Sequence, residues 1–167
     1  MNRSGLKRHK LQAIFQNTFE RRAASGLTVA TVMTEAPFCV APETSAGQLV
    51  KLFHEKRFRH FLVADGLRLA GVVSDRDVIR LFGVADTLES DYMDKVTAAE
   101  LMSTDLVTIG PQTLLCDAVG LMVDHGINCL PVVEDGQAVG ILTSTDVFLS
   151  LEQLLRSALL TPEPMLV

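Results

Sequence analysis

An ungapped internal repeat is the feature of this 167-residue sequence that most constrains its fold. When the chain is shifted by 69 positions, residues 32–81 align with residues 101–150, and nine of the 50 pairs are identical. Conservative pairs such as Ser74 with Thr143 extend the match. A repeat of this size indicates two similar units that pack against each other, because one unit of about 55 residues is too small to bury a sheet alone.

Each copy begins with the pattern of a short strand followed by a helix. The strand ends at Val40 in the first copy and at Ile109 in the second, and Thr44 and Thr113 are the expected N-caps of the helices that follow. Apolar residues recur at three- and four-residue spacing in both predicted helices, at Leu49, Leu52 and Phe53 and at Ala118, Leu121 and Met122.

Two strands and a second helix complete each copy. Alternating apolar residues predict strands over 61–64 and 70–73, and their counterparts over 130–134 and 139–142, with turns at Asp-Gly pairs between them. The closing helices begin near Ser74 and Thr143. The predicted fold class is therefore α/β in the broad sense (α+β), with two pseudo-symmetric β-α-β-β-α repeats packed sheet to sheet. The expected organisation is an N-terminal basic amphipathic helix (1–27), repeat 1 (28–84), a linker (85–97), repeat 2 (98–160) and a C-terminal tail (161–167).

The N-terminal segment differs in charge from the rest of the chain. Residues 1–26 carry a net charge of +5, whereas the remainder carries −10. Apolar residues at helical spacing accompany the basic ones, namely Leu11, Ile14, Phe15, Thr18 and Phe19. Three interpretations stand: packing on the repeats or on a second subunit, which we favour, contact with an anionic membrane surface, and contact with nucleic acid. The overall net charge of −5 argues against nucleic acid as a partner. We expect no membrane partner either.

Cysteine and histidine usage indicates neither disulfides nor a metal site. Cys39, Cys116 and Cys129 form no C-x-x-C motif and no even set, which favours a reducing cytoplasm. The four histidines lack metal-ligand spacing with one another or with the cysteines, so no metal is expected. No apolar run approaches the 18 residues of a membrane span, and no secretory signal pattern is present.

The repeated segments resemble a known family. Each unit opens near Val32-Met33-Thr34 or Leu101-Met102-Ser103 and closes on the pattern from Gly71 to Asp77 or from Gly140 to Asp146, as in a tandem pair of CBS domains, the Bateman module. The segment 130–134 fits the strand pattern of that family, whereas the first copy has Leu62 where its proline usually stands. The resemblance covers about residues 30–155 and rests on the order of motifs at fixed spacing.

Two interpretations apply to the polar residues that open the closing helices. Ser74 with Asp77, and Thr143 with Asp146, fit the capping box, although the acidic or amide partner three residues after the cap is usually Glu or Gln. The same residues suit ligand binding, because a helix N-terminus with free N–H groups attracts phosphate. The two roles are compatible. No P-loop or nucleophile elbow is present, so independent catalysis is not expected and no catalytic residue is assigned.

The resemblance implies an adenosine-containing ligand in the clefts between the repeats. By position, Asp77 and Asp146 would accept hydrogen bonds from ribose hydroxyls, since a carboxylate offers two acceptor oxygens. The remaining expected site residues are the hydroxyl partners Ser74, Thr143 and Thr145, the phosphate candidate Arg76, and walls from the opposing repeat made of Phe58, Arg59 and His60 and of Ile127, Asn128 and Cys129. Core packing is an equally good account of Phe58 and Ile127, and a solvated or local ion-pair role is an equally good account of Arg76.

Charge divides the two expected clefts. Copy one offers Lys56, Arg57, Arg59, His60 and Arg76, whereas copy two has no Lys or Arg from His125 to Asp146. We therefore expect the cleft of Asp77 to prefer a phosphorylated nucleotide, and the cleft of Asp146 to be empty or to hold a less charged adenosyl ligand, unless Arg59 reaches across to it.

The expected function is regulatory. AMP, ADP, ATP or S-adenosylmethionine would bind as a ligand between the repeats, no cofactor would be required, and an effector protein would respond to the resulting change. The alternative is a dimerisation or scaffold module with empty clefts, and an enzyme is a remote third. A homodimer through the helices is also expected, because the helix over 147–160 carries more apolar surface than one small unit needs.

Overall fold

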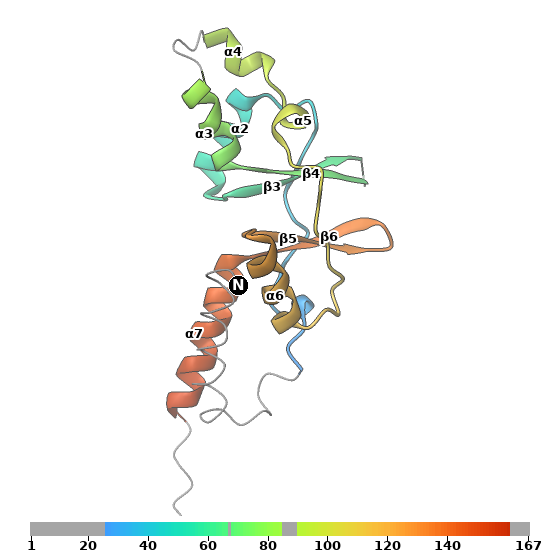
Figure 1. The fold of residues 1–167 in the computed structure, drawn as a ribbon, viewed down its shortest axis with the longest axis vertical. Coiled ribbons are helices and arrows are strands. Elements are labelled where there is room, and N and C mark those ends of the chain that lie inside the picture. Colours follow the sequence, from blue (N-terminus) through green and yellow to red (C-terminus); the bar gives the residue numbers. More distant parts are fainter. Residues whose placement is uncertain (1–25, 67, 85–89, 161–167) are drawn as a thin grey trace, which may run out of the picture.

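The computed structural model describes residues 26–66, 68–84 and 90–160, so almost all of the predicted N-terminal helix and the predicted C-terminal tail lie outside the described residues. Figure 1 shows the arrangement of the elements. In chain order they are η1 (Val29–Thr31), β1 (Thr34–Glu35), β2 (Cys39–Val40), α2 (Ala46–Lys56), β3 (His60–Asp65), β4 (Arg68–Ser74), α3 (Asp75–Val84), α4 (Ser90–Lys95), α5 (Ala98–Leu101), α6 (Leu115–His125), β5 (Cys129–Glu134), β6 (Gln137–Thr143) and α7 (Ser144–Leu160).

The repeat is reproduced in three dimensions at the same offset as in the sequence. Helix α6 begins and ends 69 positions after α2, and the hairpin β5–β6 does the same relative to β3–β4. The helix that follows each hairpin also starts at equivalent residues, Asp75 and Ser144. The predicted α+β class with two related repeats is therefore confirmed.

The two hairpins pack face to face at the centre of the molecule, where Figure 1 shows one above the other with their helices on the outer sides. Leu62 and Val72 of repeat 1 and Cys129 and Ile141 of repeat 2 form one buried cluster between them. Burial of apolar side chains from both hairpins stabilises the pairing of the repeats, since neither sheet could bury this face alone.

The first segment of each repeat packs into the core of the other. Val29 is fully buried among repeat 2 residues, and its N–H donates to the Thr113 carbonyl at 2.9 Å. Ala98 is likewise buried in the repeat 1 core, and its N–H donates to the Thr44 carbonyl at 2.7 Å. Strand β1 continues this exchange by pairing with β6 of repeat 2. The chain therefore crosses between the repeats, so neighbours in sequence and neighbours in space differ.

The predicted N-caps are wrong by position. Ser45, not Thr44, caps α2: its hydroxyl accepts from the Gln48 N–H at 3.3 Å, and its own N–H donates to the Gln48 side chain. Leu114 occupies the N-cap position of α6 and gives no side-chain cap. The carbonyls of Thr44 and Thr113 instead accept from the crossing segments. These backbone hydrogen bonds to the opposite repeat hold each threonine one residue before the N-cap position of its helix.

The predicted linker is partly a packed helix. Helix α4 contacts α2, and Met93 packs on the repeat 1 core. Residue Val96 then accepts a hydrogen bond from the Ala46 N–H at 2.8 Å. The acidic composition of this segment reflects a helix with one exposed face rather than an open connection. No helix in the described part of the chain is long and apolar enough to span a bilayer.

Candidate functional site

Asp146 lies in the first turn of α7, where a reciprocal capping box holds its side chain. Its Oδ2 accepts from the Thr143 N–H at 2.7 Å and from the Thr143 hydroxyl at 2.6 Å, while the Asp146 N–H donates to Thr143 Oγ1 at 3.4 Å. The predicted capping role is confirmed at this position. Among the described residues no donor bonds to Asp146 Oδ1.

Asp77 has the equivalent position in α3 but an additional partner. Its Oδ2 accepts from the Ser74 N–H at 2.9 Å and from the Ser74 hydroxyl at 2.6 Å, which confirms capping here as well. Its Oδ1, however, accepts from Arg80 at 3.3 Å. The residue equivalent to Arg80 in repeat 2 is Leu149. Asp77 is therefore partly neutralised within its own helix, whereas Asp146 is not.

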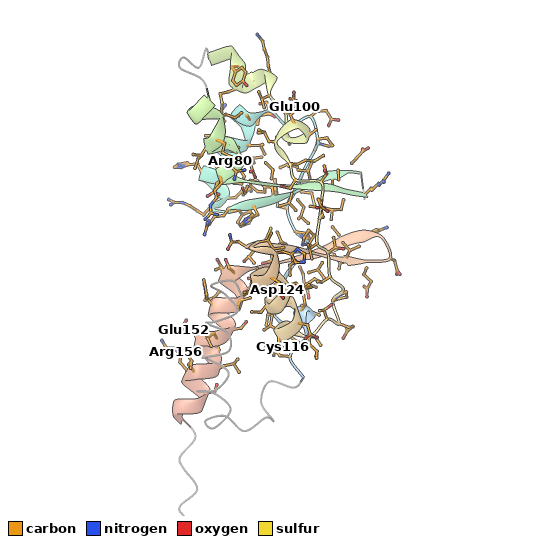
Figure 2. The ribbon with its side chains drawn as sticks, in the orientation of Figure 1. Arg80, Glu100, Cys116, Asp124, Glu152 and Arg156 are labelled. Atoms are coloured by element: carbon orange, nitrogen blue, oxygen red, sulfur yellow. The ribbon has the colours of Figure 1, made fainter. Side chains whose placement is uncertain are left out.

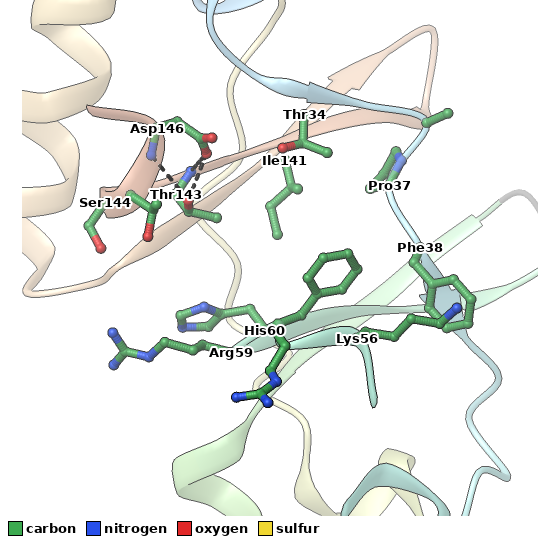
Figure 3. Close-up of a pocket in the computed structure, with 14 residues that line it drawn as sticks. Thr34, Pro37, Phe38, Lys56, Arg59, His60, Ile141, Thr143, Ser144 and Asp146 are labelled. Carbon is green, nitrogen blue, oxygen red and sulfur yellow. Dashed lines mark hydrogen bonds between the residues drawn. The ribbon is translucent and has the colours of Figure 1, made fainter. Parts of the chain in front are cut away.

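A cavity of about 400 Å³ opens beside Asp146 at the junction of the repeats, within the usual range of small-molecule sites. We call it the Asp146 cavity. Figure 3 shows Thr143, Ser144 and Asp146 on one side of it, and Arg59 and His60 on the facing side. Its lining consists of Thr34, Ala36, Pro37, Phe38, Lys56, Arg57, Phe58, Arg59, His60, Ile141, Thr143, Ser144, Thr145 and Asp146.

The structure brings six of the twelve predicted site residues to this cavity. Thr143, Thr145 and Asp146 come from the start of α7, and Phe58, Arg59 and His60 come from the segment that leads into β3. The ring of Phe58 is 45% exposed and meets Phe61 edge-on at 5.9 Å between ring centres. Phe58 therefore packs partly against the repeat 1 core and also lines the cavity.

The other six predicted residues do not line the Asp146 cavity. Ser74 and Asp77 cap α3, and Arg76 is exposed beside them. Ile127 packs against the repeat 2 core, the Asn128 carbonyl accepts from the Ser144 N–H at 3.0 Å, and Cys129 is buried between the hairpins. Asp77 lies close enough to Cys129 for its charge to act on the thiol. We call Ser74, Asp77 and the facing Cys129 the Asp77 region.

The expected distribution of charge is wrong for four of the five basic residues, while Arg76 stays beside Asp77. Lys56, Arg57, Arg59 and His60 belong to repeat 1, yet they line the cavity that contains Asp146 of repeat 2. The sequence-based hypothesis placed them with Asp77, on the assumption that the basic residues serve the carboxylate of their own repeat. The two repeats face each other, and Asp146 of repeat 2 shares its cavity with this wall of repeat 1. The stated exception, that Arg59 reaches the Asp146 side, is the arrangement observed.

The segment 34–38 is the part of the lining that sequence reasoning missed. Strand β1 is two residues long, so it has no periodicity to detect. Ala36 has a left-handed backbone (φ 45°), which a non-glycine residue adopts rarely. Arg57, also in the lining, is left-handed as well (φ 59°). Uncommon backbone at two lining positions is consistent with a functional site. The sequence feature next to this segment is Met33, which is identical to Met102 in the repeat. It indicates packing between the repeats rather than a ligand site.

Two titratable side chains near the junction depart from their ordinary behaviour. Burial lowers the pKa of His60, and the positive charge of Arg59 lowers it further, against the raising effects of Asp75 and Asp77. Burial raises the pKa of the Cys129 thiol to about 12, with a smaller contribution from Asp77. His60 therefore favours the neutral form and can act as a donor or acceptor, while Cys129 is an unreactive apolar wall. Among the described residues, no three His, Cys, Asp or Glu side chains are grouped to hold a metal ion.

Comparison with known proteins gives relatives that contain this fold. A structure of CBSX2 in complex with AMP has a TM-score of 0.68 and 33% identity, covering 78% of this chain and all of the other. A structure of CBSX2 from Arabidopsis thaliana has a TM-score of 0.65 and 29% identity, covering 79% of this chain and 99% of the other.

The curated relatives are longer proteins. The homoserine O-acetyltransferase of Methanocorpusculum labreanum is 32% identical over 126 residues, which is 74% of this chain and 24% of that protein. The chain thus spans about a quarter of the length of this enzyme. The sequence profile described as CBS domain matches residues 29–83 and 98–153, more than half of the chain. These matches coincide with the two repeats, and the chain belongs to the CBS-domain family.

Proposed function

We propose that this chain is a regulatory module that binds a phosphorylated adenosine nucleotide in the Asp146 cavity. The observation that carries the proposal is the combination of an unengaged carboxylate oxygen on Asp146 with a basic wall across the same cavity. The AMP bound by the related CBSX2 has the groups that this combination would recognise: a ribose diol and a phosphate. We expect the module itself to perform no chemical reaction.

Each part of the nucleotide has a chemically matched partner. The ribose hydroxyls would donate to Asp146 Oδ1, and the adenine ring would pack on Phe58, whose exposed face lies in the cavity. The phosphate would accept from Arg59 and from the N–H groups in the first turn of α7, where the helix dipole also favours an anion. Lys56 lies 5.2 Å from the Phe38 ring centre, toward the other end of the cavity (Figure 3).

Charge favours phosphorylated ligands over S-adenosylmethionine. Lys56, Arg57 and Arg59 line the cavity, against the single carboxylate of Asp146. A sulfonium ligand would bring another positive charge to this wall, whereas a phosphate neutralises it. Asp77 and its region lack this wall and have Arg80 as a local partner, so we assign the phosphorylated nucleotide to the Asp146 cavity alone.

Calorimetric titration of nucleotide-stripped protein tests the proposal. AMP, ADP, ATP, S-adenosylmethionine and adenosine are the ligands, and GTP is the specificity control. Asp146→Asn should remove AMP binding, while Asp77→Asn should retain it. The two variants are matched, because each alters a capping box with the same geometry. Wild-type protein with AMP at 100 times its dissociation constant should gain about 2.7 kcal/mol, a rise in melting temperature of roughly 5–10 °C.

The possible outcomes separate the candidate functions. No binding of any adenosine ligand would overturn the proposal and support the scaffold interpretation, in which both aspartates serve only as helix caps. Loss of AMP binding in Asp77→Asn but not in Asp146→Asn would place the site at Asp77 and contradict the assignment to Asp146. Binding of S-adenosylmethionine in preference to AMP would contradict the argument from charge.

We also propose that the module acts as a homodimer in the cytoplasm. Ile79 on α3 and Phe148 on α7 are equivalent in the repeat, and their side chains are 62% and 67% exposed. Helix α7 adds an exposed apolar stripe with Leu151 and Leu155, apart from the outward Glu152–Arg156 ion pair in Figure 2. Exposed apolar positions related by a pseudo-two-fold suit a second copy. The three free cysteines agree with a reducing compartment.

The dimer and its signalling role need separate tests. Light scattering at micromolar concentration should give twice the monomer mass for the wild type and the monomer mass for Phe148→Asp. A monomeric wild type would overturn the dimer. In the proposed mechanism, nucleotide binding shifts the relation between the two repeats, and an effector protein responds to that shift. The ligand changes this equilibrium only through its different affinities for the two states.

A further inference from the structure

Arg59 connects the Asp146 cavity to the start of α3. Its side chain lines the cavity, and its Nε lies 3.8 Å from Asp75 Oδ2. The Arg59 carbonyl also accepts from the Asp75 N–H at 3.1 Å. Asp75 is therefore held next to the cavity through Arg59, although it does not belong to the lining.

The backbone bond is structural, whereas the ion pair is specific to repeat 1. In repeat 2 the Ser144 N–H donates to the Asn128 carbonyl at 3.0 Å, which is the same connection between equivalent residues. Asn128 and Ser144 cannot form an ion pair. The repeat therefore folds without the Arg59–Asp75 charges, so these charges need an explanation other than the fold.

The ion pair is loose enough to be replaced. Its separation of 3.8 Å exceeds the 2.7–2.9 Å typical of a charge-assisted hydrogen bond. The side chains are 54% and 34% exposed, so water weakens their attraction. A guanidinium has five donors and binds phosphate in a bidentate manner, which a distant carboxylate does not match.

We propose that Asp75 is a specificity-determining residue that competes with the ligand phosphate for Arg59. The inference rests on the proposed function of the Asp146 cavity and adds a residue outside its lining. In the free protein Asp75 holds Arg59. A phosphate with two negative charges displaces Asp75, whereas adenosine has no anionic group that can. Asp75 therefore lowers affinity for phosphorylated ligands and leaves affinity for uncharged ones unchanged.

A double-mutant cycle measured by calorimetry tests this competition, with AMP and adenosine as the two probes. Asp75→Asn should lower the AMP dissociation constant about twofold to fivefold, the range expected for loss of an exposed ion pair. The adenosine dissociation constant should not change. In the Arg59→Gln background, Asp75→Asn should have no effect on AMP. Asp65→Asn removes the same charge at the far end of β3 and should leave both constants unchanged.

Each outcome supports or overturns the inference. An AMP constant that is unchanged or raised in Asp75→Asn overturns it, as does an equal gain in the Arg59→Gln background, which would indicate a general field effect. A change for adenosine as large as that for AMP would indicate a structural role. If Asp75→Asn fails to fold, Asp75→Ser replaces it, because serine is the equivalent residue in repeat 2. If the wild type binds neither AMP nor adenosine, the proposed function itself is overturned. If the wild type binds AMP and the Asp75→Asn substitution leaves the dissociation constant unchanged, only the competition is overturned.

Discussion

The Asp146 cavity and the Asp77 region have the same backbone design and different side-chain surroundings. In both, an aspartate in the third position of a helix accepts from the N–H and hydroxyl of the residue before the helix. Their surroundings differ: Arg59 and His60 line the cavity of Asp146, while the buried Cys129 lies within electrostatic reach of Asp77, as His60 also does. Arg80 also engages Asp77, and its counterpart Leu149 cannot engage Asp146.

The difference shows that both repeats contribute residues to a site that lies between them. One repeat contributes the carboxylate and the other contributes the wall, so a substitution in one copy alters the site of the other. The basic residues of repeat 1 line the cavity that contains Asp146 of repeat 2, whereas repeat 2 has no Lys or Arg from His125 to Asp146. The two repeats therefore share backbone geometry at the helix starts and differ in the charge around them.

The glycines under the crossing segments provide the largest expected effect on stability. A Cβ on Gly71 would overlap Met102 at three atoms, including Met102 Cβ at 2.9 Å, so the Met102 backbone would have to move. A Cβ on Gly140 would overlap mainly the flexible end of Met33. Overpacking costs about 1–3 kcal/mol. We expect Gly71→Ala near the upper end and Gly140→Ala near the lower end, measured by urea unfolding.

This pair also tests whether the crossing segments are equivalent. Gly140 lies next to the Thr34 carbonyl, at 3.2 Å from its added Cβ, and Thr34 lines the Asp146 cavity. Gly140→Ala should therefore weaken AMP binding, whereas the more destabilising Gly71→Ala should not. Equal losses of stability, or the larger loss in Gly140→Ala, would contradict the difference in packing described here.

The second largest effect is expected on ligand affinity, when a residue that lines the Asp146 cavity is replaced by its counterpart from the other repeat. Arg59→Asn gives repeat 1 the residue that repeat 2 has at this position. Loss of a hydrogen bond to a charged group costs about 1.5–3 kcal/mol, so AMP affinity should fall by roughly tenfold or more, while adenosine affinity stays constant. Asn128→Arg is the reciprocal control and should leave AMP affinity at the Asp146 cavity unchanged. An equal fall for adenosine would mean that Arg59 shapes the cavity rather than binds phosphate.

A smaller effect is expected where each first helix ends. Arg57 and Gly126 are the equivalent C-cap residues of α2 and α6, with φ of 59° and 66°. The left-handed conformation costs an L-residue about 1–2 kcal/mol relative to glycine. Arg57→Gly should therefore raise the free energy of unfolding by about 1 kcal/mol, and Gly126→Ala should lower it by a similar amount, both measured by denaturant unfolding.

Measurements of AMP binding and stability on Arg57→Gly show what the Arg57 side chain contributes to ligand binding at the cavity. Arg57→Gly should weaken AMP binding slightly, because one positive charge leaves the lining. A variant with unchanged stability would mean that Arg57 makes a compensating interaction in the free protein. Gly126→Ala meets no atom within 4 Å of its added Cβ, so its effect isolates the backbone conformation.

Local sequence patterns predicted the helix-start carboxylates, and long-range contacts decided the rest. Ser74 and Asp77 are three residues apart, so their geometry follows from the helix alone. Assignment of Arg59 to a cleft depends on how the repeats face each other, which the spacing within one repeat does not contain. The N-caps failed for the same reason, because Thr44 is held by the distant Ala98. The left-handed Ala36 has no signature in sequence, since alanine rarely adopts that conformation.

The pH dependence of stability is the smallest expected difference between the repeats, because His60 is only partly buried and its counterpart Cys129 does not titrate in the same range. Burial and Arg59 lower the pKa of His60 in the folded protein. The unfolded chain, with a histidine pKa near 6.5, therefore binds a proton more readily than the folded one. The stabilising contribution is present above about pH 6.5 and is lost as the pH falls from there toward the folded pKa.

Melting temperatures at pH 7.5 and pH 5.5 measure this loss in the ligand-free protein. The wild type should lose more stability between the two values than His60→Gln, which has no titrating group at this position. The other histidines and the carboxylates are shared by both proteins, so their contributions cancel in the difference. Equal losses would mean that Asp75 and Asp77, which raise the pKa of His60, balance burial and Arg59, and a smaller loss in the wild type would mean that they outweigh them. In either case His60 would take up a proton as readily as in the unfolded chain, and the basic wall of the Asp146 cavity would gain a fourth cation on acidification.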